Sequence, residues 1–408
     1  MRIVFFYPDY KDRIGQVGRV EMPPLGMLSV CAVVELHGIT VDVFPVNKDS
    51  EADDFPAADV YAYAITASAT YPIFLAICPK LKNKAELHIA GNTHVTIFPE
   101  KVLAELQLDA VFCGEAEQAI LEWISGGCNG RGIFRGKRVD INRFPFPARH
   151  LLPLERIYLN RRVGGKQDYI LSLSTSRGCP FHCAFCAVQN RGAVSFSSRA
   201  RLVREIKSIL DNYPLCRGFV LLDETFTLSQ RHVADTCDVF SRFGLPWECN
   251  SRADTLSENI IKKLVRSNCK EIKIGLETGS QQMADTMKKG LKLKEVEKTL
   301  TLAARHGLQT KLYILHGFPG ENMNTTMETI LFLKKMKVFV SRVAVYRFTP
   351  LPGSPIYSTQ NLVAQNWQEY TIYGNNSHWW GTSADFVELE LSYTLLVNVV
   401  EELFGKVN

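Results

Sequence analysis

The sequence predicts an α/β protein: an N-terminal Rossmann-like domain on a parallel sheet, then a partial (β/α)6 TIM-like barrel, and finally a short aromatic and helical C-terminal segment. Three observations lead to this fold class. Short apolar runs alternate with helical patterns over residues 1–125, a second alternating series begins at Tyr169, and a stretch rich in glycine and proline separates the two. With 408 residues, 46% hydrophobic and 22% charged, the chain can form two globular cores.

The first domain is expected over residues 1–130. Its strands are predicted at 3–7, 41–44, 60–65, 87–90 and 110–113, and its helices near 25–36, 72–81, 99–106 and 116–124. This alternation indicates a parallel sheet with helices on both faces, and such sheets bind ligands at the carboxyl ends of their strands. The residues at those ends are small or polar, and could contact a large ligand through their backbone: Tyr7-Pro8, Thr66-Ala67-Ser68, Gly91-Asn92-Thr93-His94 and Gly114-Glu115.

A linker is expected over residues 131–168, because the prolines of FPFPARHLLP forbid regular structure. The barrel follows over 169–358, with strands in YILSLSTS, GFVLLDE, LPWECNSR, EIKIGLET, LQTKLYILHG and VSRVAVYRFTP. Helical patterns separate them at 199–212, 230–243, 257–268, 294–306 and 325–336. Residues 359–408 form an aromatic extension that ends in an apolar helix at about 389–404.

Charge and hydropathy exclude several classes of protein. The net charge of +5, from 47 Lys and Arg against 42 Asp and Glu, is too small to indicate nucleic-acid binding. The six-residue apolar run at the N-terminus is too short for a signal peptide, and the uncharged stretch 60–79 is broken by polar residues and Pro72, so no membrane span is expected. We expect a cytoplasmic protein whose eleven cysteines are mostly reduced, so a tight group of cysteines indicates metal binding or catalysis.

Such a group follows the first barrel strand, in RGCPFHCAFC. Cys179, Cys183 and Cys186 have the spacing CxxxCxxC. Three thiolates on one short loop can bind three irons of a 4Fe-4S cubane and leave the fourth iron open for another molecule. Two alternatives are a zinc site, for which His182 is a nearby fourth ligand, and a redox dithiol of the thioredoxin type.

The cysteine loop, with the aromatic Phe185 before its last cysteine, resembles the radical S-adenosylmethionine superfamily. The first half narrows the resemblance. EMPPLGMLSVCAVVELHG, AGNTHVTIFPE and LDAVFCGEAE are similar to sequence blocks of the branch that carries an N-terminal cobalamin-binding domain. The resemblance extends over most of the chain, and the cysteine motif is its most specific part.

The resemblance implies roles in the barrel. Cys179, Cys183 and Cys186 would bind the 4Fe-4S cluster, and the amino and carboxylate groups of S-adenosylmethionine would chelate the open iron. The side chains and turns that would contact S-adenosylmethionine stand at successive strand ends: Phe185 on the adenine, Asp223 and Glu224 at the methionine amino group, Arg252 at the carboxylate or ribose, Glu277 at the ribose, and Gly317 and Gly320 in the turn HGFPGEN. The structural alternatives are a loop-filling aromatic for Phe185, a helix cap for the acidic pair and an ordinary tight turn for the glycines.

In the first domain the resemblance implies a cobalamin site. Thr66, Ser68, Gly91, Asn92 and Gly114 would surround the corrin and its tail. His94 is expected to contact corrin side groups or to cap the next helix rather than to bind cobalt, since the DxHxxG motif is absent. The family pattern has glycine where this chain has Ala90 and Ala116, so a domain that no longer binds cobalamin remains an alternative.

The implied activity is cleavage of S-adenosylmethionine to a 5′-deoxyadenosyl radical, abstraction of hydrogen from an unactivated carbon of a small molecule, and methyl transfer from cobalamin. An external one-electron reductant of the flavodoxin or ferredoxin type would be its partner. The alternatives are dehydration, oxidation or cyclisation without methyl transfer, including reactions on tetrapyrroles, and a non-catalytic redox sensor. Tyr346, Arg347, His316 and His378 are candidates for substrate contact, and Tyr346 or His316 for proton transfer.

Overall fold

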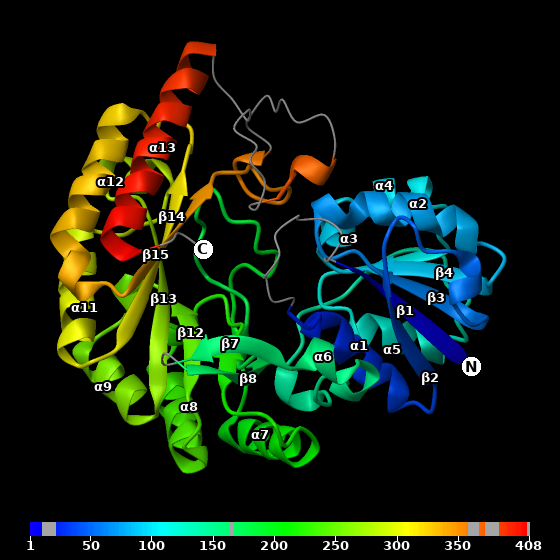
Figure 1. The fold of residues 1–408 in the computed structure, drawn as a ribbon. Helices are drawn as coiled ribbons and strands as arrows, with labels where there is room; N and C mark the ends of the chain where they lie inside the picture. Colours follow the sequence, from blue (N-terminus) through cyan, green and yellow to red (C-terminus); the bar gives the residue numbers. More distant parts are fainter. Residues whose placement is uncertain (10–21, 164–165, 358–366, 372–382, 406–408) are drawn as a thin grey trace. The chain divides into compact units, whose positions relative to one another are not determined.

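The computed structural model describes the chain except for residues 10–21, 164–165, 358–366, 372–382 and 406–408. The chain divides into two compact units. The first comprises Met1–Ile157 with Gln365–Thr371, and the second comprises Tyr158–Ala364 with Ile372–Asn408 (Figure 1).

The first unit is built on a fully parallel sheet with the strand order β2-β1-β3-β4-β5-β6. Its strands are β1 Arg2–Pro8, β2 Thr40–Val46, β3 Ala58–Ala64, β4 Ala85–Gly91, β5 Ala110–Cys113 and β6 Gly132–Arg135. The first five confirm the predicted strands. Strand order reverses between β1 and β3, and in open parallel sheets the ligand crevice lies at such a point, outside the carboxyl ends of the strands.

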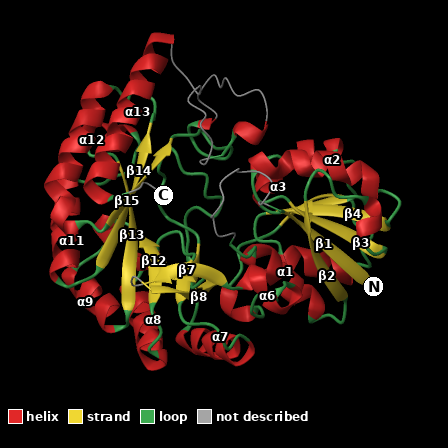
Figure 2. Cartoon of the chain, viewed as in Figure 1, coloured by secondary structure: helices red, strands yellow, loops and turns green. Residues whose placement is uncertain are grey.

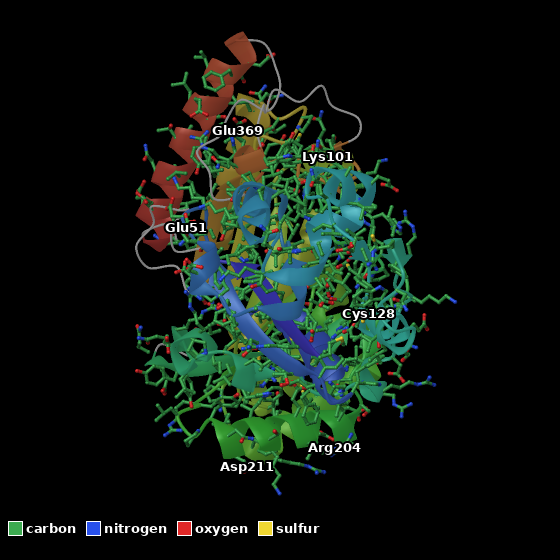
Figure 3. All side chains as sticks on the ribbon, turned by 90° about the vertical axis from the view of Figure 1, so that its right-hand side faces the viewer. Glu51, Lys101, Cys128, Arg204, Asp211 and Glu369 are labelled. Atoms are coloured by element: carbon green, nitrogen blue, oxygen red, sulfur yellow. The ribbon has the colours of Figure 1, made fainter. Side chains whose placement is uncertain are left out.

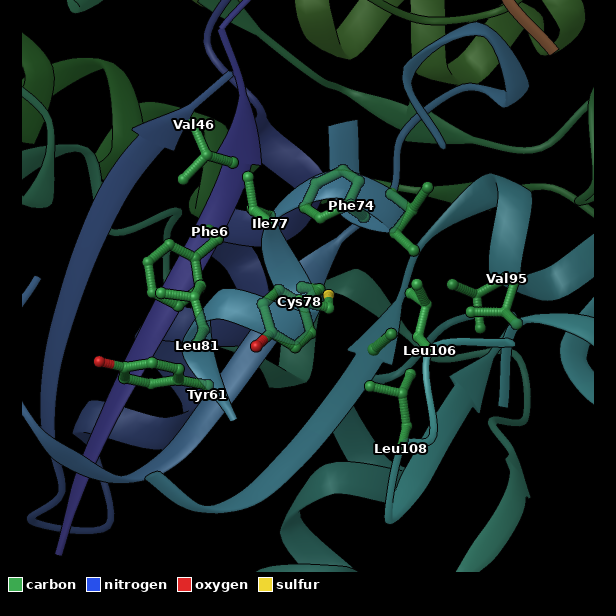
Figure 4. Packing of buried hydrophobic residues seen from close by; sticks show 14 of the residues in the cluster. Phe6, Val46, Tyr61, Phe74, Ile77, Cys78, Leu81, Val95, Leu106 and Leu108 are labelled. Carbon is green, nitrogen blue, oxygen red and sulfur yellow. The ribbon is translucent and has the colours of Figure 1, made fainter. Parts of the chain in front are cut away.

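Helices cover both faces of this sheet (Figure 2). They are α1 Leu25–Glu35, α2 Tyr71–Leu81, α3 Thr93–Ile97, α4 Pro99–Glu105 and α5 Glu117–Ser125, followed by the short α6 Leu154–Ile157. One core forms where α2, α3 and α4 pack on the sheet: Phe6, Tyr61, Phe74 and Ile77 are almost fully buried there (Figure 4). Burial of such large apolar groups is the main force that holds this layer on the sheet.

The second unit contains a seven-stranded sheet with the order β15-β14-β13-β12-β11-β8-β7. Its strands are β7 Leu159–Val163, β8 Lys166–Leu173, β11 Phe219–Leu221, β12 Trp247–Ser251, β13 Cys269–Glu277, β14 Gln309–His316 and β15 Arg342–Arg347. The six strands from β8 to β15 run parallel, which confirms the predicted partial barrel. β7 is antiparallel to β8 at the edge.

Strands β6 and β7 both lie in the stretch 131–168 for which a linker was expected. Each is only four or five residues long and stands at the edge of its sheet. Runs of this length carry too few alternations to be recognised, and pairing with a neighbouring strand stabilises them. Regular structure therefore extends into both ends of the expected linker.

Helices pack on the outer face of the second sheet (Figure 1). They are α7 Arg199–Asn212, α8 Gln230–Phe243, α9 Glu258–Arg266, α11 Leu293–Arg305, α12 Met323–Met336 and α13 Ser383–Phe404. The short α10 Gln281–Thr286 follows β13 and contributes Met283 to a separate apolar cluster. In α7 the buried Leu202 and Ile206 face the sheet, whereas Arg204 and Asp211 project outward (Figure 3). Among the described residues, no helix is both long and apolar enough to cross a membrane.

Alternation along the strands gives this sheet an apolar outer face and a polar inner face. Trp247 of β12 packs on the ring of Phe240 in α8, at 4.8 Å between centroids, so it faces the helices. The adjacent Glu248 points to the opposite face, where it pairs with Lys273 of β13. The inner face therefore carries the groups available for chemistry.

Candidate active site

The cysteine loop is closed at its base by its own backbone. Strands β9 Ser176–Arg177 and β10 Ser195–Phe196 pair antiparallel on either side of it. Cys179 N donates to Asn190 O at 3.0 Å, and Gly192 N donates to Cys179 O at 3.1 Å. Gly178 and Gly192 both have φ +98°, a conformation that glycine adopts without steric cost. The loop therefore leaves the end of β8 as a defined structure.

The thiols of Cys179 and Cys183 are close enough to Cys186 to affect its protonation. Cys183 is buried, and Cys179 and Cys186 are half-buried. Burial raises the pKa of Cys186, and the neighbouring thiols of Cys183 and Cys179 raise it further. Among the residues the structure describes, no three Cys, His, Asp or Glu side chains are grouped for one metal ion. In a cubane each cysteine binds a different iron, so the ligands of a cluster need not converge on one metal ion.

Arg252, from the end of β12, is directed at the cysteine loop. Its Nη1 lies 3.5 Å from Cys183 Sγ, and its guanidinium stacks on the ring of Phe181 at 3.7 Å from the centroid. Asp254 accepts from its Nε and Nη2 at 3.0 and 2.9 Å, and Lys289 O accepts from Nη2 at 2.6 Å. Asp254 and Lys289 O therefore hold the guanidinium in place, with Nη1 beside the cysteine loop.

The structure separates the acidic pair that the sequence placed together. Asp223 is fully buried, and its carboxylate accepts from Thr175 N, Thr175 Oγ1 and Ser176 Oγ at 2.6–2.8 Å. The expectation that Asp223 contacts S-adenosylmethionine is corrected: it anchors the strand that leads into the cysteine loop. Glu224 is solvent-exposed and accepts from Gly178 N at 3.2 Å. The residue as a whole is exposed, but partial burial of its carboxylate raises the pKa of Glu224, and the nearby Asp223 raises it as well.

Glu277, at the end of β13, is held by Lys289, a residue that the sequence analysis did not single out. Lys289 Nζ donates to Glu277 Oε1 at 2.9 Å and lies 5.4 Å from the centroid of the Phe185 ring. Glu277 has φ +68°, which is strained for a residue with a side chain. Phe185 and Glu277, the expected adenine and ribose contacts, are thus brought together by Lys289. A lysine after a helix carries no sequence signal for such a role.

An apolar cluster supports the cysteine loop from below. It contains Ala184, Met283, Met287, Phe318, Phe348 and Ile356, with Phe185 and Leu315 packed against it. Ala184 N donates to Met287 O at 2.9 Å, which joins the loop to the segment before Lys289. Phe318 belongs to the turn after β14, where Gly317 and Gly320 have φ +92° and +93°. The turn that contains these glycines therefore lies beside the loop, and their contact with S-adenosylmethionine stays a prediction.

The structure does not bring His316 to the inner face. Its imidazole lies 3.0 Å from Ser392 Oγ of α13 and 3.3 Å from Thr326 Oγ1 of α12, and burial lowers its pKa to about 4. The expectation that His316 handles a proton is corrected, because neighbouring helices enclose it. Tyr346 of β15 is paired in register with Leu315, on the face of the sheet opposite to that of His316. Arg347 pairs with Glu390 of α13, and His378 lies outside the described residues.

In the first unit, the residues expected around cobalamin gather at the carboxyl ends of β3, β4 and β5. Thr66 and Ser68 follow β3, Gly91 and Asn92 end β4, and Gly114 follows β5. Asn92 and Gly114 turn with φ +87° and +76°, and Gly114 is exposed. Small side chains and tight turns leave the backbone of this edge accessible, which fits a large ligand.

His94 lies behind this edge, inside an aromatic group. Its Nδ1 is 2.9 Å from Ser68 Oγ, its Nε2 is buried and has no hydrogen-bond partner among the described residues, and burial lowers its pKa to about 4. The rings of Tyr71, Phe98 and Trp367 surround it at 4.4–5.1 Å between centroids. Trp367 comes from the C-terminal part of the chain, and no sequence pattern predicted that it packs here.

Comparisons with known proteins agree with this division. The Radical SAM superfamily matches residues 173–333, and the B12 binding domain matches residues 14–124. An uncharacterized methyltransferase of Pyrococcus horikoshii is 26% identical, over 91% of this chain and 86% of its own. The bacteriochlorophyllide d C-12(1)-methyltransferase of Chlorobaculum tepidum is 22% identical, over 87% of this chain and 78% of its own.

Two solved structures share the fold. The radical S-adenosylmethionine methyltransferase TsrM from Kitasatospora setae, with cobalamin and a 4Fe-4S cluster bound, superposes with a TM-score of 0.70 at 14% identity, over 98% of this chain and 88% of that one. The cobalamin-dependent S-adenosylmethionine radical enzyme OxsB has a TM-score of 0.71 at 13% identity, over 98% and 66%. The radical SAM match indicates an enzyme that uses a 4Fe-4S cluster and S-adenosylmethionine. The chain thus contains a radical SAM domain and, before it, a B12-binding domain.

Proposed function

We propose that this protein is a cobalamin-dependent radical S-adenosylmethionine methyltransferase that methylates an unactivated carbon of a small molecule. One observation carries the proposal: a three-cysteine loop at the carboxyl end of a half-barrel and a B12-binding domain occur in one chain. Relatives named for methyl transfer to bacteriochlorophyllide d and to cytidylyl-2-hydroxyethylphosphonate support it over dehydration, oxidation or cyclisation.

When bound, the cluster and cobalamin supply the electron that splits S-adenosylmethionine and the carrier that holds the methyl group. The chain's own residues bind and orient. Cys179, Cys183 and Cys186 hold the cluster, and Arg252 fixes the loop that carries them. The exposed carboxylate of Glu224 is available to the methionine amino group, because charge-assisted hydrogen bonds to such groups are strong.

Phe185 and Glu277 form the nucleoside end of the proposed S-adenosylmethionine site. The aromatic ring offers a face for adenine, and the carboxylate offers acceptors for the ribose hydroxyls. Lys289 keeps both in place through its contacts with the ring and with the carboxylate. We place the corrin at the edge formed by Thr66, Ser68, Gly91, Asn92 and Gly114.

The proposal also assigns an external one-electron reductant of the flavodoxin or ferredoxin type and a cytoplasmic location. The cysteines support the cytoplasmic location, since all eleven are free thiols in the structure. Reduced thiols are the ordinary state in a reducing compartment.

The test is the visible spectrum of protein purified anaerobically from cells supplied with cobalamin, followed by incubation with dithionite and S-adenosylmethionine. We expect corrin bands beside the broad iron-sulfur absorption, and release of 5′-deoxyadenosine. Cys183→Ala is the matched control: it should lose the cluster absorption and the nucleoside product but keep the corrin bands, since a different unit binds cobalamin. Cluster absorption without corrin bands would count against methyl transfer.

A further inference from the structure

Three cations stand side by side on the inner face of the half-barrel. Lys273 of β13, Lys311 of β14 and Arg342 of β15 are direct partners in register on adjacent strands. They alternate with Ile272 and Leu312, which are fully buried under the helices. Neighbouring parallel strands lie about 4.8 Å apart, and like charges directly opposite each other destabilise a sheet. These three neighbouring cations therefore require negatively charged groups nearby to offset their mutual repulsion.

The protein supplies carboxylates to the two outer cations. Lys273 Nζ lies 2.6 Å from Glu248 Oε1, and both side chains are almost fully buried. The Arg342 guanidinium contacts both oxygens of Glu271 at 2.6 Å. Glu248 Oε1 also forms an ion pair with Arg161 Nη2 of β7 at 3.1 Å. Each of these two carboxylates is therefore already used.

The middle cation, Lys311, is left without a counter-charge. None of the described carboxylates lies within ion-pair distance of the Lys311 ammonium. Its nitrogen lies over the ring of Tyr313, 5.3 Å from the ring centroid. The pKa of Lys311 is lowered to about 8, chiefly by burial and also by the cations Arg342, Lys273 and Arg161, while Glu271 opposes them. The side chain is only half-buried, so a small anion has access to it.

A hydrogen-bond donor stands next to Lys311 on the same face. Tyr313 lies two positions further along β14, and its phenol has no hydrogen-bond partner among the described residues. Burial raises its pKa, so it remains a donor at neutral pH. Its ring lies 6.0 Å from that of Tyr346, which is paired with Leu315 beside the cysteine loop. A molecule bound at Lys311 could therefore extend along two tyrosines toward the cofactor loop.

We propose that Lys311 and Tyr313 bind an anionic group of the substrate, a carboxylate or a phosphate. The inference rests on the proposed function, which requires the substrate to reach the carboxyl ends of these strands. Lys311 lies five positions before the end of β14, which is about 16 Å along a strand. The substrate is thus an elongated acid whose anion is anchored deep on the inner face while its reacting carbon lies near the cofactors.

The test is competitive acetylation of lysines in the full chain, purified anaerobically from cells supplied with cobalamin, at pH 8 and matched ionic strength. Phosphate, acetate and chloride are compared, and mass spectrometry reports each lysine. We expect phosphate or acetate to slow labelling of Lys311 about tenfold at saturation, because charge-assisted hydrogen bonds to an anion are strong. Lys298, exposed on α11, should label equally in all three salts. Protection by phosphate alone would indicate a phosphate substrate, and protection by acetate a carboxylic acid.

Variants separate this site from a general effect of salt. Phosphate should raise the unfolding midpoint of the wild type, of Lys298→Met and of Lys311→Arg, but not of Lys311→Met. Equal labelling of Lys311 in all salts, or no labelling at all, would overturn the inference. These readouts do not depend on turnover, so protein that protects Lys311 but lacks corrin bands would refute the proposed function and leave the anion site standing.

Discussion

Replacing Gly275 by alanine tests the role of Glu277 without removing its carboxylate. A Cβ at this position would stand 2.3 Å from Glu277 Oε1 and 3.1 Å from Lys289 Nζ, and the first distance is shorter than real Cβ contacts. The carboxylate must therefore move. Since it is the end of a flexible side chain, the strand itself can stay in place.

The expected magnitude follows from the interaction that is lost. Hydrogen bonds to a charged group contribute about 1.5–3 kcal/mol, so a carboxylate moved away from the ribose should weaken S-adenosylmethionine binding about 10-fold to 100-fold. The cost to folding should be smaller, about 1 kcal/mol, because a crowded side chain takes a less favourable rotamer. Binding should therefore change much more than stability.

The assay is equilibrium binding of S-adenosylmethionine to anaerobically reconstituted protein, together with urea unfolding. Gly26→Ala in α1 is the control, since its Cβ would meet no atom within 4 Å. It should leave S-adenosylmethionine binding unchanged. If Gly275→Ala bound S-adenosylmethionine as tightly as the wild type, Glu277 could not be the ribose acceptor.

Three further outcomes are expected. Cys183→Ser should abolish iron-sulfur absorption and 5′-deoxyadenosine formation, and persistence of either after reconstitution would contradict the ligand assignment. Asp223→Asn should lower the free energy of unfolding by about 3 kcal/mol, because it disrupts a buried carboxylate that accepts three hydrogen bonds. Glu224→Gln should instead weaken S-adenosylmethionine binding with little effect on urea unfolding. The reverse pattern would exchange the roles of the two residues. Burial lowers the pKa of His94 and His316 to about 4, so the unfolded chain binds more protons below pH 6.5 and stability falls as pH falls. Between pH 7 and pH 5 the loss should be about 2 kcal/mol for each histidine, and His316→Gln should reduce the slope measured by urea unfolding.

The sequence by itself determined the two series of strands and helices and the cysteine loop. These features are local: apolar runs, helical periodicity and capping residues act within a few positions, as in α7 and α8, whose observed bounds are those predicted. The loop was recognisable because three ligands on one short segment need no information about distant residues.

The tertiary structure decided what the flanking residues do. Asp223 and Glu224 are neighbours in the chain, yet one is enclosed by the strand before the loop and the other is exposed. His316 stands at a strand end, as the sequence required, but on the face that the helices cover. The face that a strand residue occupies depends on the neighbouring strands and helices, and the sequence of one strand does not contain that information.

The same reason explains the two lysines that the sequence did not identify. Lys289 meets Glu277 only because β13 and the segment after α10 fold against each other. Within the described part of the chain, Lys311 has no paired carboxylate because strand register places Lys273 and Arg342 beside it, and Glu248 and Glu271 pair with those two cations. Register and burial arise from contacts between distant segments, so they appear only when the chain is folded.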